Sequence, residues 1–297
     1  MIGVMRPRSL LIILAAPALV AQSLTGVLDL HVHSDPDSVP RSIDAIGAAR
    51  LAKQRGMRGL LLKNHYEPTA SLAYEVRQVV PGIELFGGIA LNRTVGGINP
   101  AAVERMTMVK GGWGRVVWMP TFDSENQVRS SGEKRPFVSV SRSGKLLPEV
   151  MEVLKVIARR QLVLETGHST PEENLMLIRE AKRLGIAKII VTHPLTPPVK
   201  MSDAQIREAA KLGAFLEFPY LPLIDKQQFI PLERYALAIR AAGVDRAILS
   251  SDLGQAGNPL HPDGMADYFV RLRSAGFSVA DIEKMSKRNP ARAMGLE

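Results

Sequence analysis

Histidines carry most of the chemistry that this sequence suggests. The chain has 297 residues and six histidines, namely His31, His33, His65, His168, His193 and His261. His31 and His33 form a His-x-His pair at the end of an apolar segment, and side chains two residues apart on a strand face the same side. Two imidazoles on one strand are a preformed ligand pair for zinc, manganese or iron. The pair therefore predicts a metal site, the alternative being two surface histidines on a loop.

Three more side chains at the ends of apolar segments indicate the same site. His193 closes the segment Ile-Ile-Val-Thr-His. It lies two and four residues after Val191 and Ile189, so on a strand it would face the same side as they do, which is expected to be the inside. His168 follows Leu-Glu-Thr-Gly, and Asp252 follows Leu-Ser-Ser. A loop position for His168, or a helix N-cap role for Asp252, would explain either residue alone. Their convergence with the His-x-His pair favours a metal centre built from several strands.

The elements that position these residues alternate between short apolar segments and longer helical patterns, which is typical of βαβ units. The predicted strands are 27–33, 57–63, 83–91, 115–120, 161–166, 187–193, 214–218 and 246–252, and the predicted helices are 42–55, 70–80, 100–110, 148–160, 171–184, 202–212, 231–242 and 262–275. Eight such repeats over about 250 residues predict one α/β domain, a (β/α)8 TIM barrel spanning residues 26–297. A doubly wound sheet is the alternative, but the first strand is not followed by the Gly-rich phosphate loop of that fold.

The connection after the fourth predicted strand is longer than a barrel requires. Residues 121–147 contain two short apolar stretches, 137–140 and 145–147, on either side of Arg142-Ser143-Gly144. This pattern predicts a β-hairpin insertion on the face where barrel active sites lie. A lid or a subunit contact, and hence a homo-oligomer, would fit such an insertion.

Composition limits the other functions. The net charge is +9, but the basic residues are scattered and aromatic residues make up only 5%, which argues against a nucleic-acid surface. Without cysteine the chain has no disulfide, thiolate ligand or thiol nucleophile. Arg6 and Arg8 precede the apolar residues 9–20, a pattern that resembles a secretory signal and is too short for a stable membrane span. Residues 1–25 therefore predict export rather than a cytoplasmic location, although a segment packed on the barrel floor is the alternative.

Several motifs together resemble the amidohydrolase superfamily. They are Asp-Leu-His-Val-His-Ser-Asp-Pro-Asp at 29–37, the positions of His168, His193 and Asp252, and Asn-Pro-Ala-Arg-Ala-Met-Gly-Leu at 289–296. Residues 60–70 and the sequence Glu-Thr-Gly-His-Ser-Thr resemble the DUF6282 branch of amidohydrolase-like proteins, and the resemblance covers nearly the whole chain from residue 28. It implies that His31, His33 and Asp252 bind one metal, and that His168 and His193 bind a second metal or the substrate.

The lysine at a strand end departs from the superfamily pattern. Binuclear members commonly carry a carboxylated lysine on the fourth strand, whereas this fourth segment ends Trp-Met-Pro and Lys63 ends the second. A carboxylated Lys63 would bridge two metals, a plain ammonium would bind an anionic substrate or balance charge, and a surface lysine is the third alternative. The number of metal ions, one or two, is therefore left open.

Four other polar residues have weaker signals. His65 lies two residues after Lys63, so the two share a side of the strand, and it is expected to contact substrate or a metal ligand. Arg93 is expected to pair with a substrate carboxylate or phosphate, the alternative being a bare surface arginine. Glu165 lies three residues before His168 and is expected to face the other side of its strand. His261 begins the last barrel helix and is expected to be structural.

These features predict a metal-dependent hydrolase, with zinc as the expected metal. A divalent metal lowers the pKa of water from about 15.7 toward about 7, and Asp252 would take the proton while His193 or Lys63 assists. The expected substrate is a small molecule with an amide, cyclic amide, lactone or ester bond, anionic if Lys63 and Arg93 bind it. The alternatives are a phosphoesterase, a metal-dependent decarboxylase or lyase, and a barrel that binds a metal or small molecule without turnover.

Overall fold

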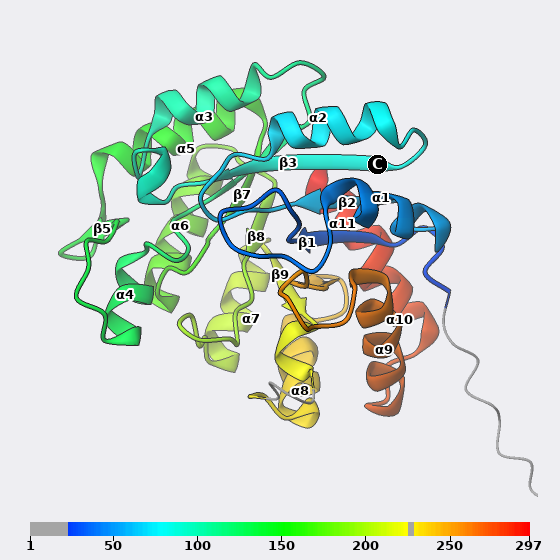
Figure 1. Ribbon diagram of the computed structural model, residues 1–297. Helices are drawn as coiled ribbons and strands as arrows, with labels where there is room; N and C mark the ends of the chain where they lie inside the picture. Colours follow the sequence, from blue (N-terminus) through cyan, green and yellow to red (C-terminus); the bar gives the residue numbers. More distant parts are fainter. Residues whose placement is uncertain (1–22, 225–228) are drawn as a thin grey trace, which may run out of the picture.

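The computed structural model describes residues 23–224 and 229–297. Short parallel strands form the centre of the molecule, and helices cover their outer side (Figure 1). Within the described residues the sheet runs in the order β1-β2-β3-β4-β7-β8-β9-β10. Its two edges meet just beyond the strand ends, where Val32 forms a parallel bridge with Leu253 and the backbone N of His33 donates to the carbonyl of Leu253 at 2.9 Å. The predicted (β/α)8 barrel is confirmed.

Each predicted strand and barrel helix has a counterpart in the structure, with boundaries shifted by a few residues. The strands are β1 Leu28–Val32, β2 Gly59–Leu62, β3 Glu84–Ala90, β4 Gly114–Trp118, β7 Val163–Glu165, β8 Ile189–Val191, β9 Phe215–Pro219 and β10 Ala247–Ser250. The barrel helices are α1 Ala45–Gln54, α2 Ala70–Val79, α3 Pro100–Thr107, α5 Pro148–Arg160, α6 Pro171–Arg183, α7 Asp203–Lys211, α8 Leu232–Ala242 and α9 His261–Ser274. The chain ends with α10 Val279–Glu283, a π-helical segment Lys284–Arg288 and α11 Asn289–Met294, which the sequence patterns did not predict.

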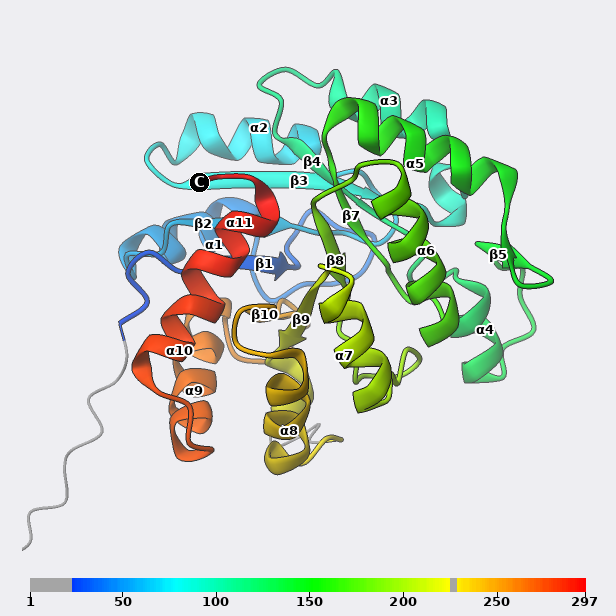
Figure 2. The ribbon, with the colours of Figure 1, turned by 180° about the vertical axis from the view of Figure 1, so that it is seen from behind.

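Alternation along the strands separates two apolar cores. The interior of the barrel receives side chains from all eight strands of this sheet and from α11, namely Leu28, Leu30, Leu61, Phe86, Ala90, Val116, Trp118, Val163, Ile190, Phe215, Ile248, Ala293 and Met294. The alternate strand residues pack outward against the helices in a larger core. Figure 2 shows α11 beside β1, so this helix covers the end of the barrel where the strands begin.

A capping box explains where helix α6 begins. Thr170 Oγ1 accepts from the backbone N of Glu173 at 3.2 Å, and the Glu173 carboxylate accepts from the backbone N of Thr170 at 2.9 Å. Pro171 occupies the first turn, where its missing N–H costs no hydrogen bond. Such a box stabilises a helix start by about 1 kcal/mol. Because the box begins directly after His168 and Ser169, it also fixes the loop that carries this histidine.

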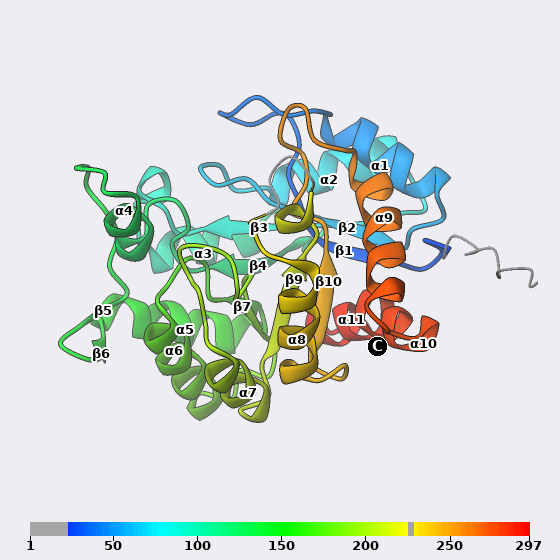
Figure 3. The same ribbon diagram turned by 90° about the horizontal axis from the view of Figure 1, so that it is seen from below.

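The long connection between β4 and α5 forms a separate lobe. It contains helix α4 Glu125–Ser131 and an antiparallel hairpin of β5 Ser141–Arg142 and β6 Lys145–Leu146, which confirms the predicted hairpin. Figure 3 shows α4 and this hairpin at one edge of the molecule, away from α10 at the other.

The structure describes little of the N-terminal segment that was predicted to be a secretory signal. Apart from residues 23–25, the expected signal segment lies outside the described residues. Across 23–224 and 229–297, no helix combines the length and the hydropathy that crossing a membrane requires.

Candidate metal centre

A cavity of about 340 Å³ opens where the strands end. His31, His33, Lys63, His193 and Asp252 are among the side chains that line it, and all five are buried or nearly so. The cavity therefore collects side chains from β1, β2, β8 and β10 or the residues that directly follow them. This is the end of the barrel at which TIM-barrel active sites are built.

His31, His33 and Asp252 form one tight group. In the described part of the chain, these residues form the group of three or more possible ligands whose ligand atoms lie close enough together to hold a metal ion. Nε2 of His31 and Nε2 of His33 lie 3.1 and 3.0 Å from Oδ1 of Asp252. Ligand atoms about 2.0–2.2 Å from one tetrahedral zinc ion lie about 3.3 Å apart, so the observed spacing fits a divalent cation. Burial opposes ionisation of Asp252, but His31 and His33 hold its pKa below the usual range and keep it charged.

Fixed acceptors determine which nitrogen of these two rings faces the cavity. Nδ1 of His31 donates to Oε1 of Glu217 at 2.8 Å, and Nδ1 of His33 donates to the carbonyl of Lys63 at 2.6 Å. A carboxylate and a carbonyl can only accept here, so each Nδ1 carries the hydrogen. Each Nε2 then faces Asp252 and the cavity, where it donates to the carboxylate when it carries a hydrogen and can bind a cation when it does not, as in metal-binding histidines whose other nitrogen is hydrogen-bonded.

His168 and His193 form a second pair of facing rings, with their Nε2 atoms 3.2 Å apart. Nδ1 of His193 donates to Oγ1 of Thr196 at 2.7 Å, since that hydroxyl gives its own hydrogen to the carbonyl of His193. Nδ1 of His168 donates to Oε1 of Gln127 at 2.9 Å. Burial lowers the pKa of His193 to about 4 and that of His168 well below its usual value, so both rings are neutral at pH 7. Two lone pairs at this distance repel each other unless a cation lies between them.

A layer of buried charge lies beneath the histidines. Nζ of Lys63 is 2.9 Å from Nε2 of His31, and the side chain is fully buried. Burial lowers the pKa of Lys63, which nearby carboxylates oppose, and burial raises the pKa of Glu165 to about 8. Within the described residues, Oε1 of Glu165 and Oε2 of Glu217 are buried without a hydrogen-bond partner. This layer therefore holds ionisable groups whose charges depend on what binds above them.

The orientation predicted for β8 is wrong, although His193 does enter the cavity. Ile189 and Val191 pack outward against the helices, and Ile190 faces the barrel interior. His193 reaches the cavity because the chain leaves the strand after Val191 and takes a φ of 26° at His193. The histidine is thus aimed by local backbone geometry and not by strand alternation.

The prediction that Glu165 faces away from the site is also wrong. Glu165 shares the inner side of β7 with Val163. His168 lines the cavity, above the buried Glu165, because Gly167, with a φ of 61°, turns the chain between them. A Cβ at Gly167 would lie 2.2 Å from the carbonyl of Met119, so only glycine fits this turn.

The comparisons with known proteins agree with this architecture. A sequence profile of DUF6282, described as a family of unknown function, matches residues 26–217. The chain belongs to the DUF6282 family. No curated protein sequence matches it.

Solved structures similar to this DUF6282 protein are barrels of matching length. A phosphotriesterase homology protein from Escherichia coli, complexed with phosphate in its active site, has a TM-score of 0.61 at 18% identity over 91% of this chain and 99% of that chain. An amidohydrolase from Pseudomonas aeruginosa has a TM-score of 0.63 at 14% identity, covering 92% and 97%. A lactonase from Listeria monocytogenes has a TM-score of 0.56 at 15% identity, covering 94% and 97%. At these identities the likeness establishes the fold.

The remaining predicted residues of the DUF6282 protein fall in different places. Lys63 and His65 line the cavity, and the His65 ring stacks on His33 with centroids 4.9 Å apart. Arg93 is exposed and lines a different groove. The arginine that lines the cavity is Arg41, which the sequence did not single out and which pairs with Asp37 at 2.6 Å.

His261 lies just outside the cavity and supports its wall. Its Nε2 is 3.0 Å from the carbonyl of His33 and 2.9 Å from that of Leu253, and a nitrogen that carries its hydrogen donates to both. These bonds tie the end of β1 to the segment that follows β10. The contacts are those of the structural residue that the sequence predicted.

Three residues that hold the histidines were not predicted from the sequence. Glu217 had a usable signal, because a lone carboxylate in Phe-Leu-Glu-Phe-Pro puts a charge inside an apolar strand. For Thr196, in the loop after β8, the only signal was that it lies three residues from His193 in the sequence. Gln127 had none, because it lies 41 residues from His168 in a polar segment.

Proposed function

We propose that this DUF6282 protein is a metal-dependent hydrolase, with zinc as the metal, that acts on a lactone, ester, amide or cyclic amide of a small molecule. The observation that carries the proposal is the set of imidazole Nε2 atoms that face one buried cavity beside Asp252. Similarity in fold to proteins named as a lactonase, an amidohydrolase and a phosphotriesterase homology protein supports it.

The donor set supports one position for a cation and a second position for a cation or a substrate group. His31, His33 and Asp252 would hold one ion, and His168 and His193 would hold a second ion or a polar group of the substrate. A bound divalent cation supplies Lewis acidity, which lowers the pKa of water from about 15.7 toward about 7 and polarises an acyl oxygen.

The chain's own residues then supply proton transfer and orientation. Asp252 stays ionised at neutral pH and is the carboxylate nearest the histidines, so it accepts the proton of the attacking water and passes it to the leaving group. Glu217 and Thr196 hold the His31 and His193 rings in place. Lys63 lines the cavity as a hydrogen-bond donor and would stabilise negative charge on the substrate.

The mouth of the cavity suggests a substrate with an apolar part. Val39, Phe122 and Phe229 line it and are exposed by 39, 36 and 51%. The volume of about 340 Å³ suits a small molecule. His65 would contact this substrate. Arg41 is better placed than Arg93 to pair with an anionic group, because Arg93 would be reached only by a substrate that extends into the neighbouring groove.

Phosphoester hydrolysis is a second candidate. The structural relative from Escherichia coli holds phosphate in its active site, and an organophosphorus hydrolase has a TM-score of 0.62 to this chain. A decarboxylase or lyase with one metal would use the same ligands and is separated from hydrolysis by its products.

The test combines metal analysis with a substrate panel. Purified protein should contain about one or two equivalents of divalent metal and should hydrolyse a member of a panel of lactones, esters, amides and phosphotriesters. Chelation should abolish turnover and added zinc should restore it. His31→Ala should lose activity and the ion held with His33 and Asp252, whereas Glu172→Gln on the surface should keep both. Protein that lacks metal after zinc loading, or that turns over equally well after chelation, would overturn the proposal.

We further propose that the protein is exported and forms oligomers through the insertion lobe. The basic and apolar pattern of residues 6–20 supports export, and mass spectrometry of the mature N-terminus tests it. Phe137, exposed by 39% on that lobe, supports a subunit contact, and sedimentation of wild type against Phe137→Ser tests it.

A further inference from the structure

Helix α4 of the insertion reaches into the metal centre. Its first turn contacts His168 through three side chains. Oγ of Ser124 and Nδ2 of Asn126 donate to the carbonyl of His168 at 3.2 and 3.0 Å. Oε1 of Gln127 accepts from Nδ1 of the same ring at 2.9 Å. The insertion thus holds both the backbone and the imidazole of this histidine.

His31, His33 and His193 obtain their Nδ1 acceptors from the barrel itself. Glu217 lies on β9, the carbonyl of Lys63 directly follows β2, and Thr196 lies in the loop after β8. Among the four rings discussed here, His168 is the one whose acceptor comes from the insertion, through Gln127. A barrel without α4 would leave this Nδ1 without its partner.

We propose that Gln127 is a positioning residue that makes His168 able to bind a second cation, an inference that rests on the proposed metal-dependent function. Its amide oxygen holds the hydrogen on Nδ1 and fixes the plane of the ring. The lone pair of Nε2 then points to Nε2 of His193, 3.2 Å away. Without the acceptor, the hydrogen can move to Nε2 and be donated to His193, which closes the position for a cation.

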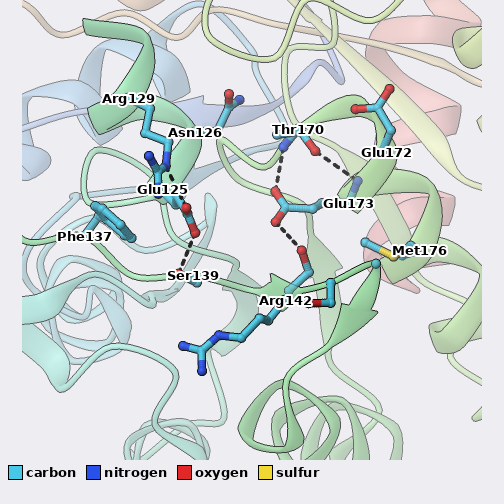
Figure 4. Close-up of a pocket in the computed structure, with 13 residues that line it drawn as sticks. Glu125, Asn126, Arg129, Phe137, Ser139, Arg142, Thr170, Glu172, Glu173 and Met176 are labelled. Atoms are coloured by element: carbon cyan, nitrogen blue, oxygen red, sulfur yellow. Dashed lines mark hydrogen bonds and ion pairs between the residues drawn. The ribbon is translucent and has the colours of Figure 1, made fainter. Parts of the chain in front are cut away.

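Helix α4 is anchored independently of Gln127, so the role can be tested without unfolding the lobe. Glu125 accepts from Arg129 at 2.7 Å and from Oγ of Ser139 at 2.6 Å. Figure 4 shows this cluster beside a groove of about 620 Å³ that separates α4 from the start of α6. Arg129 points to the groove and is 66% exposed at its side chain, which makes it a control position on the same helix.

The experiment compares wild type with three variants. Gln127→Met keeps the length of the side chain and removes the acceptor, Gln127→Glu retains an acceptor oxygen, and Arg129→Gln perturbs the groove side of α4. In metal-free protein, nitrogen-15 NMR of the histidine rings reports which nitrogen of His168 carries the hydrogen. In a second measurement, zinc alone is titrated against a chromophoric chelator.

Wild type, Gln127→Glu and Arg129→Gln should show the Nδ1-protonated form of His168 and should bind two equivalents of zinc. Gln127→Met should show the Nε2-protonated form and should bind the second equivalent about 10–100-fold more weakly, with the first unchanged. Wild type that binds one equivalent, or Gln127→Met that matches wild type in tautomer and second-site affinity, would overturn the inference. Neither measurement needs turnover, so a failure of this inference can be distinguished from a failure of the proposed hydrolysis.

Discussion

Replacing Gly254 with alanine should damage the metal centre through the backbone and not through a ligand. Gly254 lies two residues after Asp252, at the seam where the chain after β10 meets the end of β1, and its carbonyl accepts from the backbone N of Ser42 at 2.8 Å. Its φ is 122°, a backbone conformation that residues with a side chain rarely adopt. An added Cβ would lie 2.1 Å from the carbonyl oxygen of His33 and 2.8 Å from its Cβ.

Two costs add at this position. Holding a residue with a side chain in such a backbone conformation costs about 1–3 kcal/mol. Moving the neighbouring backbone to relieve the overlap with His33 costs about 1–3 kcal/mol more, which is the usual cost of adding atoms to a well-packed protein core. The free energy of unfolding should therefore fall by about 2–6 kcal/mol. The displaced His33 should also weaken zinc binding, since its Nε2 faces Asp252.

Gly257 provides the matched control, because it shares only the first cost. Its φ is 84°, and an added Cβ would have no atom within 4 Å. Gly257→Ala should lose about 1–3 kcal/mol and keep its zinc affinity. Urea unfolding followed by circular dichroism measures the first quantity, and chelator competition the second. Equal losses in the two alanine variants, or wild-type zinc affinity in Gly254→Ala, would show that the contact with His33 does not govern the site.

Other changes test the site more directly. Asp252→Asn should abolish hydrolysis and leave the circular dichroism spectrum unchanged, because the amide keeps the shape but cannot take a proton; persisting turnover would remove this carboxylate from the mechanism. Glu217→Gln should weaken zinc binding about 10–100-fold in chelator competition, because the acceptor for His31 loses its charge, and an unchanged affinity would contradict the role. Zinc should raise the melting temperature of wild type more than that of His31→Ala in thermal scans. Burial lowers the pKa of His261 to about 4, so below about pH 6.5 the unfolded chain binds a proton that the folded protein does not. Stability should thus fall between pH 6.5 and 4 by about 3 kcal/mol at about 1.4 kcal/mol per pKa unit, and His261→Gln should lack this part of the fall in urea titrations at pH 7 and 4.5.

The barrel could be predicted because its signals are local. Every strand of the sheet has its own apolar segment, and proline, glycine and acidic residues mark many helix ends, as at Pro171 and Gly185. Helix α4 has end signals, with Ser124 as its N-cap and Gly132 at its C-terminal end, but it lacks an apolar period, because Val128 is the one buried apolar side chain in Glu-Asn-Gln-Val-Arg-Ser-Ser. Contacts with the rest of the fold, such as those to His168, stabilise it instead.

The candidate site could be predicted as a set of residues but not as a geometry. Parallel strands bring their carboxyl ends together, so residues at those ends converge whatever their exact orientation. The orientation of the side chains depends on backbone turns at Gly167 and His193. Positive φ values at single residues produce no periodic sequence pattern, so these turns could not be predicted. The partners of the rings come from distant segments, and for Gln127 the sequence offered no sign at all.

Charge balance in the layer beneath the histidines connects the number of metal ions to the state of Lys63. On the inner side of three strands an apolar residue is followed two positions later by an ionisable one, namely Leu61 and Lys63, Val163 and Glu165, and Phe215 and Glu217. Buried ion pairs are often less stable than apolar replacements, so this layer is better explained by function than by folding.

When ionised, Glu165, Glu217 and Asp252 carry three negative charges, which one divalent cation and a plain Lys63 ammonium would balance. A carboxylated Lys63 would add a fourth negative charge, and two divalent cations would then balance the site without substrate. With a plain ammonium, a second cation leaves an excess of two positive charges that an anionic substrate would have to offset. Metal counting by elemental analysis and carbon-13 NMR of the folded protein, prepared with labelled bicarbonate, should therefore be made on the same sample, because the two results constrain each other.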